Sequence, residues 1–325
     1  MEESIRCCYV ETIQPINGDF LKMIMVDASF ILELFLRYNE KRQESEDPML
    51  VEAWLSSVVW HDLLLLENQL PFFVIEKLYN LALPSRSNSL SLIQLTFNFF
   101  NTLNINDNNF LDEEIQHFTH LLRFFQLPPP NKKKLPDRFH EMILPKYSAT
   151  QLHEAGVKFK VSSSKCVLDL KFNGGVLEIP PLNFNDSTEA HVRNIMALKQ
   201  CDYRRVTYIT DFYLILDHLI NTTTDVDLLI DKGIVFNCLG DNNAMTSMIN
   251  NLNKGIFARN MNNEYYLLCK KLNDHYEEPW HKKKATLRHQ YFSNPWRTAS
   301  TIAAIILLVL TFIQTIFSIL QVVKA

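Results

Sequence analysis

Apolar residues recur every three or four positions through most of the chain, which is the period of a helix packed on a core. The clearest case is Met23–Tyr38, with apolar residues at 23, 26, 30, 31, 34, 35 and 38. The same pattern predicts helices over 51–66, 71–83, 90–103 and 113–126. The polar stretches 84–90 and 104–109 are typical of loops. Residues 1–127 are therefore predicted to be a helical N-terminal part of the body.

The stretch 128–136, PPPNKKKLP, cannot be helical and is the best candidate for an internal boundary, a Pro- and Lys-rich linker or loop. The part that follows, 137–278, begins with a helical turn over Ser148–Ala155 that Gly156 closes. The period then changes to two over 157–161 and 168–172, and Asn173-Gly174 is a strong hairpin signal before 176–179. These features predict a three-stranded antiparallel meander at 157–179. Helices are predicted again at 187–200, 208–220, 225–232, 241–253 and 263–289, so the fold class is mainly α with a small antiparallel β meander (α+β).

The C-terminal segment 298–323 contains no charged residue, and 17 of its last 22 residues are apolar. A helix of this length spans about 39 Å, more than the hydrocarbon core of a bilayer requires. The alternative is a buried core helix, but such helices carry a polar face and usually charges. The N-terminus has no signal-peptide pattern, and only Lys324 and Ala325 follow the segment. The sequence therefore predicts one C-terminal transmembrane helix that acts as a tail anchor.

Basic residues gather beside this segment, in the stretch 279–297. It contains five basic and no acidic residues, whereas residues 1–278 have a net charge of −10 within a total of −4. The five residues of this membrane collar are Lys282, Lys283, Lys284, Arg288 and Arg297. The positive-inside tendency places the collar and the acidic body in the cytosol, on the plasma membrane or the endoplasmic reticulum. The collar is either a stop-transfer flank without lipid specificity or a contact for anionic headgroups.

Two further features bear on location and partners. The sequons that begin at Asn185 and Asn221 are expected to be unused, since the body is predicted to be cytosolic. Six cysteines without a CxxC pair fit reduced thiols in the cytosol. The net acidity of the chain argues against a nucleic-acid partner.

Small and polar residues repeat along one face of the predicted transmembrane helix. They are Ser300, Ala304, Thr311, Gln314, Ser318 and Gln321, with Leu307 completing the alternating spacing of four and three. Small residues allow helices to approach closely, and amides can hydrogen-bond across helices in lipid. This transmembrane stripe predicts self-association or pairing with the span of a protein partner. The alternative is a lone anchor that tolerates scattered polar residues.

Catalytic motifs are absent from the sequence: it contains no HExxH, GxSxG, P-loop or GxGxxG. We therefore predict no catalytic, cofactor or metal site, and the chain is not expected to be an enzyme. His117 and His120 are three apart on a predicted helix, a spacing that suits a metal but is also commonplace. Asp27 lies on the helix face of Met23 and Phe30, which places it either buried with a partner or at the rim of a pocket.

Four polar residues, Asp62, Glu67, Asn68 and Gln69, bracket the apolar run Leu63–Leu66. The interpretation we favour is structural: a helix end near Pro71 leaves orphan carbonyls and amides, and these side chains would pair with them. The other interpretation is a carboxylate cluster in which Asp27, Asp62 and Glu67 perform acid–base work.

Several segments together resemble the plant family called domain of unknown function 247. They are MIMVDASFILELF (23–35), DLLLLENQLPFFVIEKLY (62–79), ATQLHEAGVKFK (149–160), GGVLEIPPL (174–182) and YFSNPWRTASTIAAIILLVLTFIQTIFSIL (291–320). They occur in the family's order and cover most of the chain. The resemblance implies a mostly helical, membrane-attached plant protein without established enzymatic activity. Some members are linked to pollen self-incompatibility in grasses, which suggests recognition or signalling.

The chain departs from the family pattern in two places. Members usually have an upstream segment with a Gly-Pro-Tyr-His-type motif, so we expect a short member in which apolar surface is left uncovered. Ala28-Ser29 also replaces the Gly and Cys that often follow the matching aspartate, a change that a helix tolerates.

The leading hypothesis is a tail-anchored interaction or signalling protein whose acidic body contacts a cytosolic partner. The alternatives are a membrane-tethered enzyme that uses Asp27, Asp62 and Glu67, and a truncated member without function. A pocket that joins these carboxylates would favour the enzyme, whereas wide separation or full pairing by backbone amides would count against it.

Overall fold

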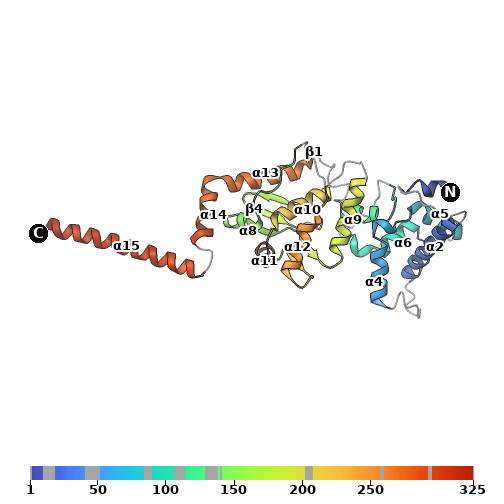
Figure 1. Cartoon of the computed structure of the whole chain (residues 1–325), viewed down its shortest axis with the longest axis horizontal. Coiled ribbons are helices and arrows are strands. Elements are labelled where there is room, and N and C mark those ends of the chain that lie inside the picture. The colour runs from blue at the N-terminus through green and yellow to red at the C-terminus, as the bar shows by residue number, and fades with distance from the viewer. Residues whose placement is uncertain are drawn as a thin grey trace.

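The computed structural model describes residues 2–9, 19–40, 52–83, 90–104, 106, 114–128, 138–139, 141–201, 208–256, 260–291 and 295–324. This part of the chain is elongated (Figure 1). The N-terminal helices lie at one end, the small sheets lie in the middle, and α15 (Pro295–Lys324) projects from the other end. Buried side chains between Ile5 and Leu272 form one continuous core. Apart from Pro128, the predicted boundary at 128–136 lies outside the described residues.

The N-terminal part is helical, as predicted. Its helices are α1 (Glu2–Arg6), α2 (Asp19–Asn39), α4 (Ala53–Asp62), α5 (Phe72–Ala82), α6 (Leu92–Phe99) and α7 (Phe118–Gln126), with short 3₁₀ turns η1 (Leu66–Asn68) and η2 (Asn101–Leu103). Helix α2 packs on α5 and α6. Aromatic rings fill the space between them: the ring centroid of Phe35 lies 4.7 Å from that of Phe99 and 5.6 Å from that of Phe118.

Three of these helices are shorter than predicted, and the one predicted over 90–103 gives way to the 3₁₀ turn η2 after Phe99. The helix predicted over 51–66 ends at Asp62, and Leu65 already has extended backbone with a ψ of 134°. The helix predicted over 113–126 begins only at Phe118, since His117 is extended and caps it. The Leu run therefore lies in a turn, with Leu63 and Leu64 buried and the next two leucines half-buried.

The C-terminal part continues with helices that agree closely with the predicted ranges, apart from the end of α13. They are α8 (Ala149–Glu154), α9 (Thr188–Cys201), α10 (Tyr208–Leu219), α11 (Thr223–Asp231), α12 (Asn242–Leu252) and α13 (Asn263–Glu277). Two strand pairs were not predicted: β1 (Arg138–Phe139) pairs with β7 (Met261–Asn262), and β5 (Leu182–Phe184) pairs in parallel with β6 (Val235–Asn237). Their strands have only two or three residues, too few to show an alternating pattern.

The main sheet has three strands, β2 (Lys158–Val161), β3 (Lys171–Asn173) and β4 (Val176–Ile179), in the order β2-β4-β3. The hairpin of β3 and β4 is antiparallel as predicted, with Gly174 and Gly175 in the left-handed region at φ 55° and 75°. However, β2 pairs with β4 in parallel, so the predicted antiparallel meander is wrong and the sheet is mixed. The irregular stretch 162–170 connects β2 to β3 across the sheet. The two strands therefore lie on opposite edges of β4, which occupies the middle.

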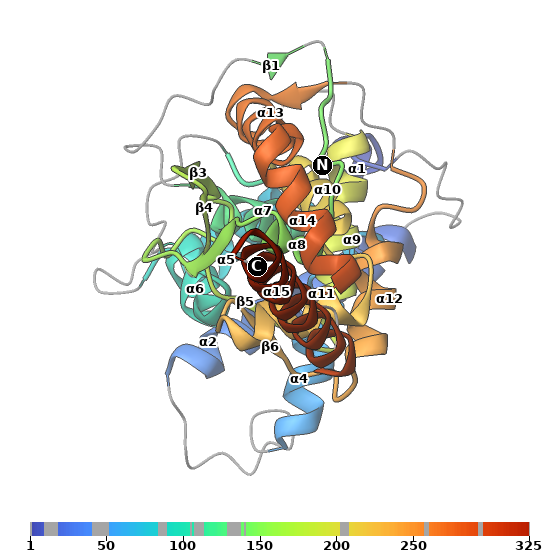
Figure 2. The same ribbon diagram turned by 90° about the vertical axis from the view of Figure 1, so that its left-hand side faces the viewer.

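One predicted helix, over 263–289, is interrupted. Helix α13 ends at Glu277 and α14 (Pro279–Tyr291) begins after Glu278, whose ψ is 128°. Pro279 causes this break, because a proline ring disfavours helical backbone at the residue before it. The chain therefore turns sharply before α14, and α14 lies across the direction of α15 (Figures 1 and 2).

Candidate functional site

The turn between α4 and α5 is organised by the buried side chain of Gln69. Its Nε2 donates to the carbonyl oxygens of Leu63 at 2.8 Å and Leu65 at 2.6 Å, and its Oε1 accepts from the backbone amide of Thr119 at 3.1 Å. Asn68 adds a longer hydrogen bond to the carbonyl of Asp62 at 3.3 Å. The two amide residues therefore have the structural role that we favoured, and Gln69 also fixes the turn to α7.

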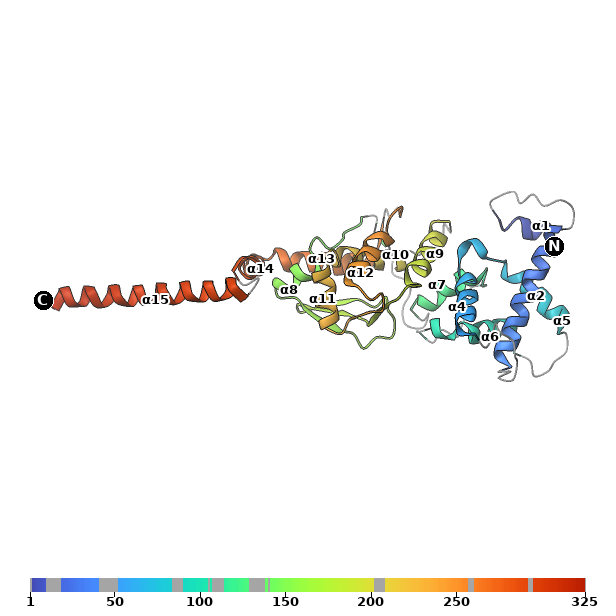
Figure 3. The same cartoon turned by 60° about the horizontal axis from the view of Figure 1, so that its bottom comes forward.

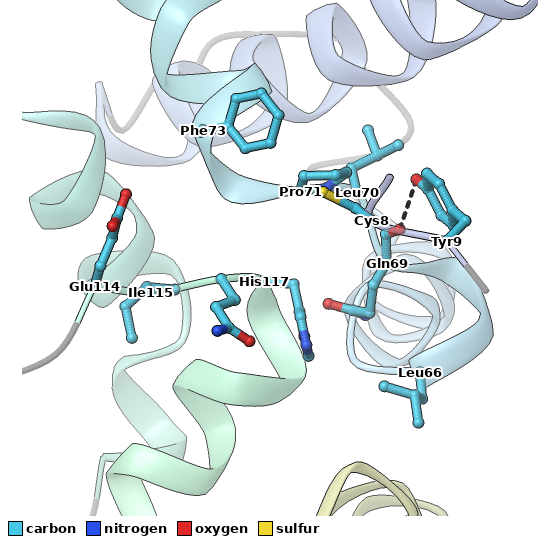
Figure 4. Close-up of a pocket in the computed structure, with 11 residues that line it drawn as sticks. Cys8, Tyr9, Leu66, Gln69, Leu70, Pro71, Phe73, Glu114, Ile115 and His117 are labelled. Carbon is cyan, nitrogen blue, oxygen red and sulfur yellow. Dashed lines mark hydrogen bonds between the residues drawn. The ribbon is translucent and has the colours of Figure 1, made fainter. Parts of the chain in front are cut away.

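A first hollow of 470 Å³ opens on one side of this turn (Figure 4). Its wall is formed by Gln69, Leu70 and Pro71 from the turn, Cys8 and Tyr9 from the N-terminus, and residues 114–117 before α7. The hydroxyl of Tyr9 donates to the carbonyl of Gln69 at 3.1 Å. Burial, with a smaller contribution from Cys7, raises the pKa of the Cys8 thiol, so this thiol is not an activated nucleophile.

His117 lines this hollow and caps α7 at the same time, and His120 follows it in the first turn of that helix. Nδ1 of His117 accepts from the backbone amide of His120, and Nδ1 of His120 accepts from the amide of Gln116, both at 3.3 Å. Burial and then the neighbouring His120 lower the pKa of His117 to about 4, which keeps it neutral. Within the described ranges no group of three or more His, Cys, Asp or Glu side chains is placed to hold a metal ion. The spacing of three residues allows the ring of His117 to accept from the backbone amide of His120 and so to cap α7.

A second hollow, of 390 Å³, lies on the other side of the same turn, against α2. It joins Asp27 from α2 with Asp62 and Glu67 from the turn. All three side chains are exposed, and none forms an ion pair or side-chain hydrogen bond with any described residue. Asp27 is therefore at the rim of a pocket, one of the two positions predicted. Asp27, which is 35 or more positions from the other two carboxylates in the sequence, lines the same hollow as they do.

Apolar groups surround these carboxylates. Ile24, Ile31 and Leu63 are buried beneath the hollow, and Met23 and Phe30 line it while remaining 50% and 42% exposed. The sequence placed Met23 and Phe30 on a core-facing stripe, but the core face of α2 runs through Ile24, Ala28 and Ile31. In the sequence, the one sign that Met23 and Phe30 are exposed is that the polar Asp27 lies on the same helix face. The hollow thus presents an apolar surface with an acidic rim.

The collar and stripe residues lie at the opposite end of the molecule. Lys282, Lys283 and Lys284 lie in α14, as does Arg288, whose side chain is outside the described part. Arg297 lies in the first turn of α15, and the six stripe residues follow along that helix. The stripe residues are exposed, and Thr311 Oγ1 donates to the carbonyl of Leu307 at 2.7 Å.

Helix α15 carries a long, strongly apolar stretch. Within Trp296–Ile319, the most apolar stretch of 18 residues has a mean hydropathy of 2.6 and is not buried by the rest of the protein. By length and composition this is one helix that is long and apolar enough to cross a membrane. The fold therefore defines a mainly helical body, hollowed at one end, with a projecting apolar helix at the other.

Comparisons with known proteins show the family of the chain. Residues 1–310 match the family domain of unknown function 247, described as a plant protein of unknown function, and the chain belongs to that family. It is 27% identical to UPF0481 protein At3g47200 of Arabidopsis thaliana over 99% of this chain and 72% of that protein. It is 22% identical to the putative UPF0481 protein At3g02645 of the same plant over 97% of this chain and 77% of that protein. These names give no support to a link with self-incompatibility. No solved structure matches the chain.

Proposed function

We propose that this protein is a single-pass, tail-anchored membrane protein whose cytosolic body recognises a protein partner through the second hollow. The observation that carries the proposal is the arrangement of Asp27, Asp62 and Glu67, three carboxylates that pair with no described residue and lie around an apolar surface. Unpaired charge beside exposed apolar side chains is complementary to a segment that carries basic and apolar residues together.

The position of the hollow supports this proposal. It is formed by α2 and the turn after α4, and these elements lie at the end of the molecule opposite to α15 (Figures 1 and 3). If α15 spans the bilayer, the hollow faces the aqueous phase at the greatest distance from the membrane. A partner could then reach it without contact with lipid.

The membrane-tethered enzyme is the second candidate, because one hollow does join all three carboxylates. A carboxyl group that acts as a general acid must hold its proton near neutral pH, and desolvation is the usual cause. Asp27, Asp62 and Glu67 are all exposed to solvent, and the thiol of the adjoining hollow is not activated. Recognition therefore fits the site better than catalysis, and we propose no enzymatic activity.

Proximity labelling in the native plant tissue tests the recognition role. The full chain is compared with Asp27→Asn/Asp62→Asn/Glu67→Gln and with a control, Glu52→Gln/Glu76→Gln/Asp231→Asn, which removes three exposed carboxylates elsewhere. Partners labelled by the parent and the control should be missing with the first variant. Identical labelled proteins with both variants would overturn the role of the hollow.

Membrane attachment is tested separately. The full chain should remain in the membrane pellet after alkaline extraction, and a chain that ends at Trp296 should be released. An endoglycosidase should not change the mobility of the native protein, since Asn185 and Asn221 would be cytosolic. A glycan on either residue would overturn the proposed orientation.

A further inference from the structure

Helix α14 turns an aromatic and apolar face away from the protein body. Trp280, Leu287 and Tyr291 are 74%, 53% and 48% exposed, and their spacing of seven and four places them on one side of the helix. Ala285, on the opposite side, is 2% exposed, and α14 packs there against α8 and α13. An amphipathic helix on a soluble body normally has the reverse arrangement.

The lysines of α14 are not equivalent, although they are consecutive. Lys282 is paired with Glu277 at 3.0 Å, and Nζ of Lys284 lies beside Gly156, at the C-terminal end of α8. A cation at this position is favourable, because helix C-termini carry partial negative charge. Lys283 lies on the outward side near Trp280 and has no ion pair or hydrogen bond among the described residues. The outward face therefore combines apolar rings with a free positive charge, and α14 contains no acidic residue.

This face points in the direction in which α15 projects. Helix α14 lies between the body and α15, and α15 continues away from the body on the outer side of α14 (Figures 1 and 2). The two helices meet at the first turn of α15, where Trp296 is 86% exposed. If α15 crosses a bilayer, α14 lies along the surface of that bilayer and its outward face meets the lipid.

We infer that α14 is an interfacial helix that binds the anionic headgroup layer of the leaflet that α15 enters. This inference rests on the proposed membrane anchor. Tryptophan and tyrosine favour the headgroup level, because one part of each ring system is apolar and another forms hydrogen bonds. Lys283 can extend to phosphate while its stem remains among the apolar groups. The packing of α14 on α8 then holds the body at a fixed orientation, with the second hollow facing away from the membrane.

Quenching of tryptophan fluorescence by brominated phospholipid tests the inference on the full chain in nanodiscs. The chain has four tryptophans, and Trp54 and Trp60 lie in α4 at the far end of the body. In the variant Trp296→Phe, quenching by the lipid therefore reports Trp280. We expect clear quenching in this variant and its loss in Trp296→Phe/Trp280→Phe. Trp280 is largely exposed, so its replacement should not affect the fold.

Charge dependence is tested in discs of phosphatidylcholine with and without phosphatidylserine. Each basic residue near an anionic surface changes the equilibrium between bound and free helix about fivefold. In the phosphatidylserine discs, adding Lys283→Glu to Trp296→Phe should therefore lower the ratio of bound to free helix at least about fivefold. Quenching of Trp280 measures this ratio. The matched control, Lys254→Glu, reverses an exposed lysine at the end of α12 and should have no effect.

The outcomes separate this inference from the membrane anchor on which it rests. A chain that does not incorporate into nanodiscs would overturn both. A chain that incorporates but shows no quenching of Trp280 would overturn the interfacial helix alone. A protein would then be the remaining ligand for the outer face of α14. Quenching that is equal in both lipid mixtures and insensitive to Lys283→Glu would overturn the requirement for anionic lipid.

Discussion

Nδ1 of His61 lies 3.3 Å from Nε2 of His191, and this contact joins α4 of the N-terminal part to α9 of the C-terminal part. The two imidazole rings are 5.2 Å apart, and the indole of Trp60 packs edge-on against both. His191 is 9% exposed. Only one hydrogen can lie between the two nitrogens, so the contact requires that at least one ring is neutral. The interface between the two parts of the body is therefore sensitive to protonation.

The first prediction concerns stability in acid. Burial, and then the neighbouring His61, lower the pKa of His191 from 6.5 to about 4. Below pH 6.5 the unfolded chain binds a proton that the folded chain rejects, so the contribution of His191 is complete above pH 6.5 and is lost as the pH falls toward 4. This loss is about 3 kcal/mol. Urea unfolding of the full chain in a non-ionic detergent should show it.

The matched variants are His191→Gln and His218→Gln, since His218 is an exposed histidine of α10. His191→Gln should flatten the pH profile between 6.5 and 4, because glutamine does not titrate there, while His218→Gln should leave it unchanged. His117 contributes a slope of the same sign, so a residual decrease is expected in both variants. An equal slope in the parent and His191→Gln would contradict this prediction.

The sequence predicted most of the helices because their information is local. The period of Met23–Tyr38, the Gly156 cap after α8 and the hairpin signal at Asn173-Gly174 are each local in the sequence. The order of strands could not be predicted in the same way, since β2 could pair on either side of the hairpin without any change in its alternation. The irregular stretch 162–170 determines on which side β2 pairs, and its sequence has no hydrophobic period from which this could be predicted.

The candidate site shows the same limit. The position of Asp27 at a pocket rim was one of two options that the helix face allowed, and the segment 62–71 stood out as polar residues around a leucine run. Their juxtaposition in the second hollow depends on the packing of α2 against elements that follow it by more than 30 residues. The contact between His61 and His191 spans 130 residues, and no local signal indicates it.

The second prediction concerns Asp225, a fully buried carboxylate that joins the first turns of α8 and α11. It accepts hydrogen bonds from Ser148 Oγ at 2.7 Å, the amide of Thr150 at 2.8 Å, the amide of Asn221 at 3.2 Å, and the amide and hydroxyl of Thr222 at 3.0 and 2.9 Å. Burial alone would raise its pKa, but these donors lower it below 3.8. Its stabilising contribution is therefore present above that pH and lost as the pH falls further.

We expect Asp225→Asn to reduce the free energy of unfolding by about 3 kcal/mol, because an amide nitrogen would face donors in a buried site. The control is Asp231→Asn, an exposed residue at the last turn of the same helix, which should change it by less than about 0.5 kcal/mol. Urea unfolding at pH 7 measures both. Equal stability of the two variants would show that the donors around Asp225 find other partners.

The third prediction concerns Gln69. Gln69→Leu removes a group that satisfies two carbonyls and one amide in the turn beside both hollows, and the expected loss of stability is about 2–3 kcal/mol. Asn68→Ala removes one longer hydrogen bond of an exposed neighbour and should cost under about 1 kcal/mol. Thermal unfolding followed by circular dichroism would compare them. Indistinguishable midpoints would contradict the organising role of Gln69.

The fourth prediction concerns the transmembrane stripe. Gln314 and Gln321 are exposed, lie two helical turns apart, and make no side-chain hydrogen bond with the described part of the chain. In hydrocarbon their amides would lack partners, and association of two spans would supply them. Thr315 is different, because its hydroxyl already donates to the carbonyl of Thr311 at 2.8 Å within α15. Thr315→Leu is therefore a control that removes a polar group without removing an unsatisfied one.

We expect Gln314→Leu/Gln321→Leu to reduce the association constant of the full chain in vesicles about thirtyfold, as measured by cross-linking, since each of the two interhelical hydrogen bonds that it removes contributes about 1 kcal/mol. Thr315→Leu should cross-link like the parent. Cross-linking by Gln314→Leu/Gln321→Leu at the level of the parent would mean that a lone anchor tolerates these amides. A decrease that also occurs with Thr315→Leu would attribute association to the general polarity of the helix and would contradict pairing through the stripe.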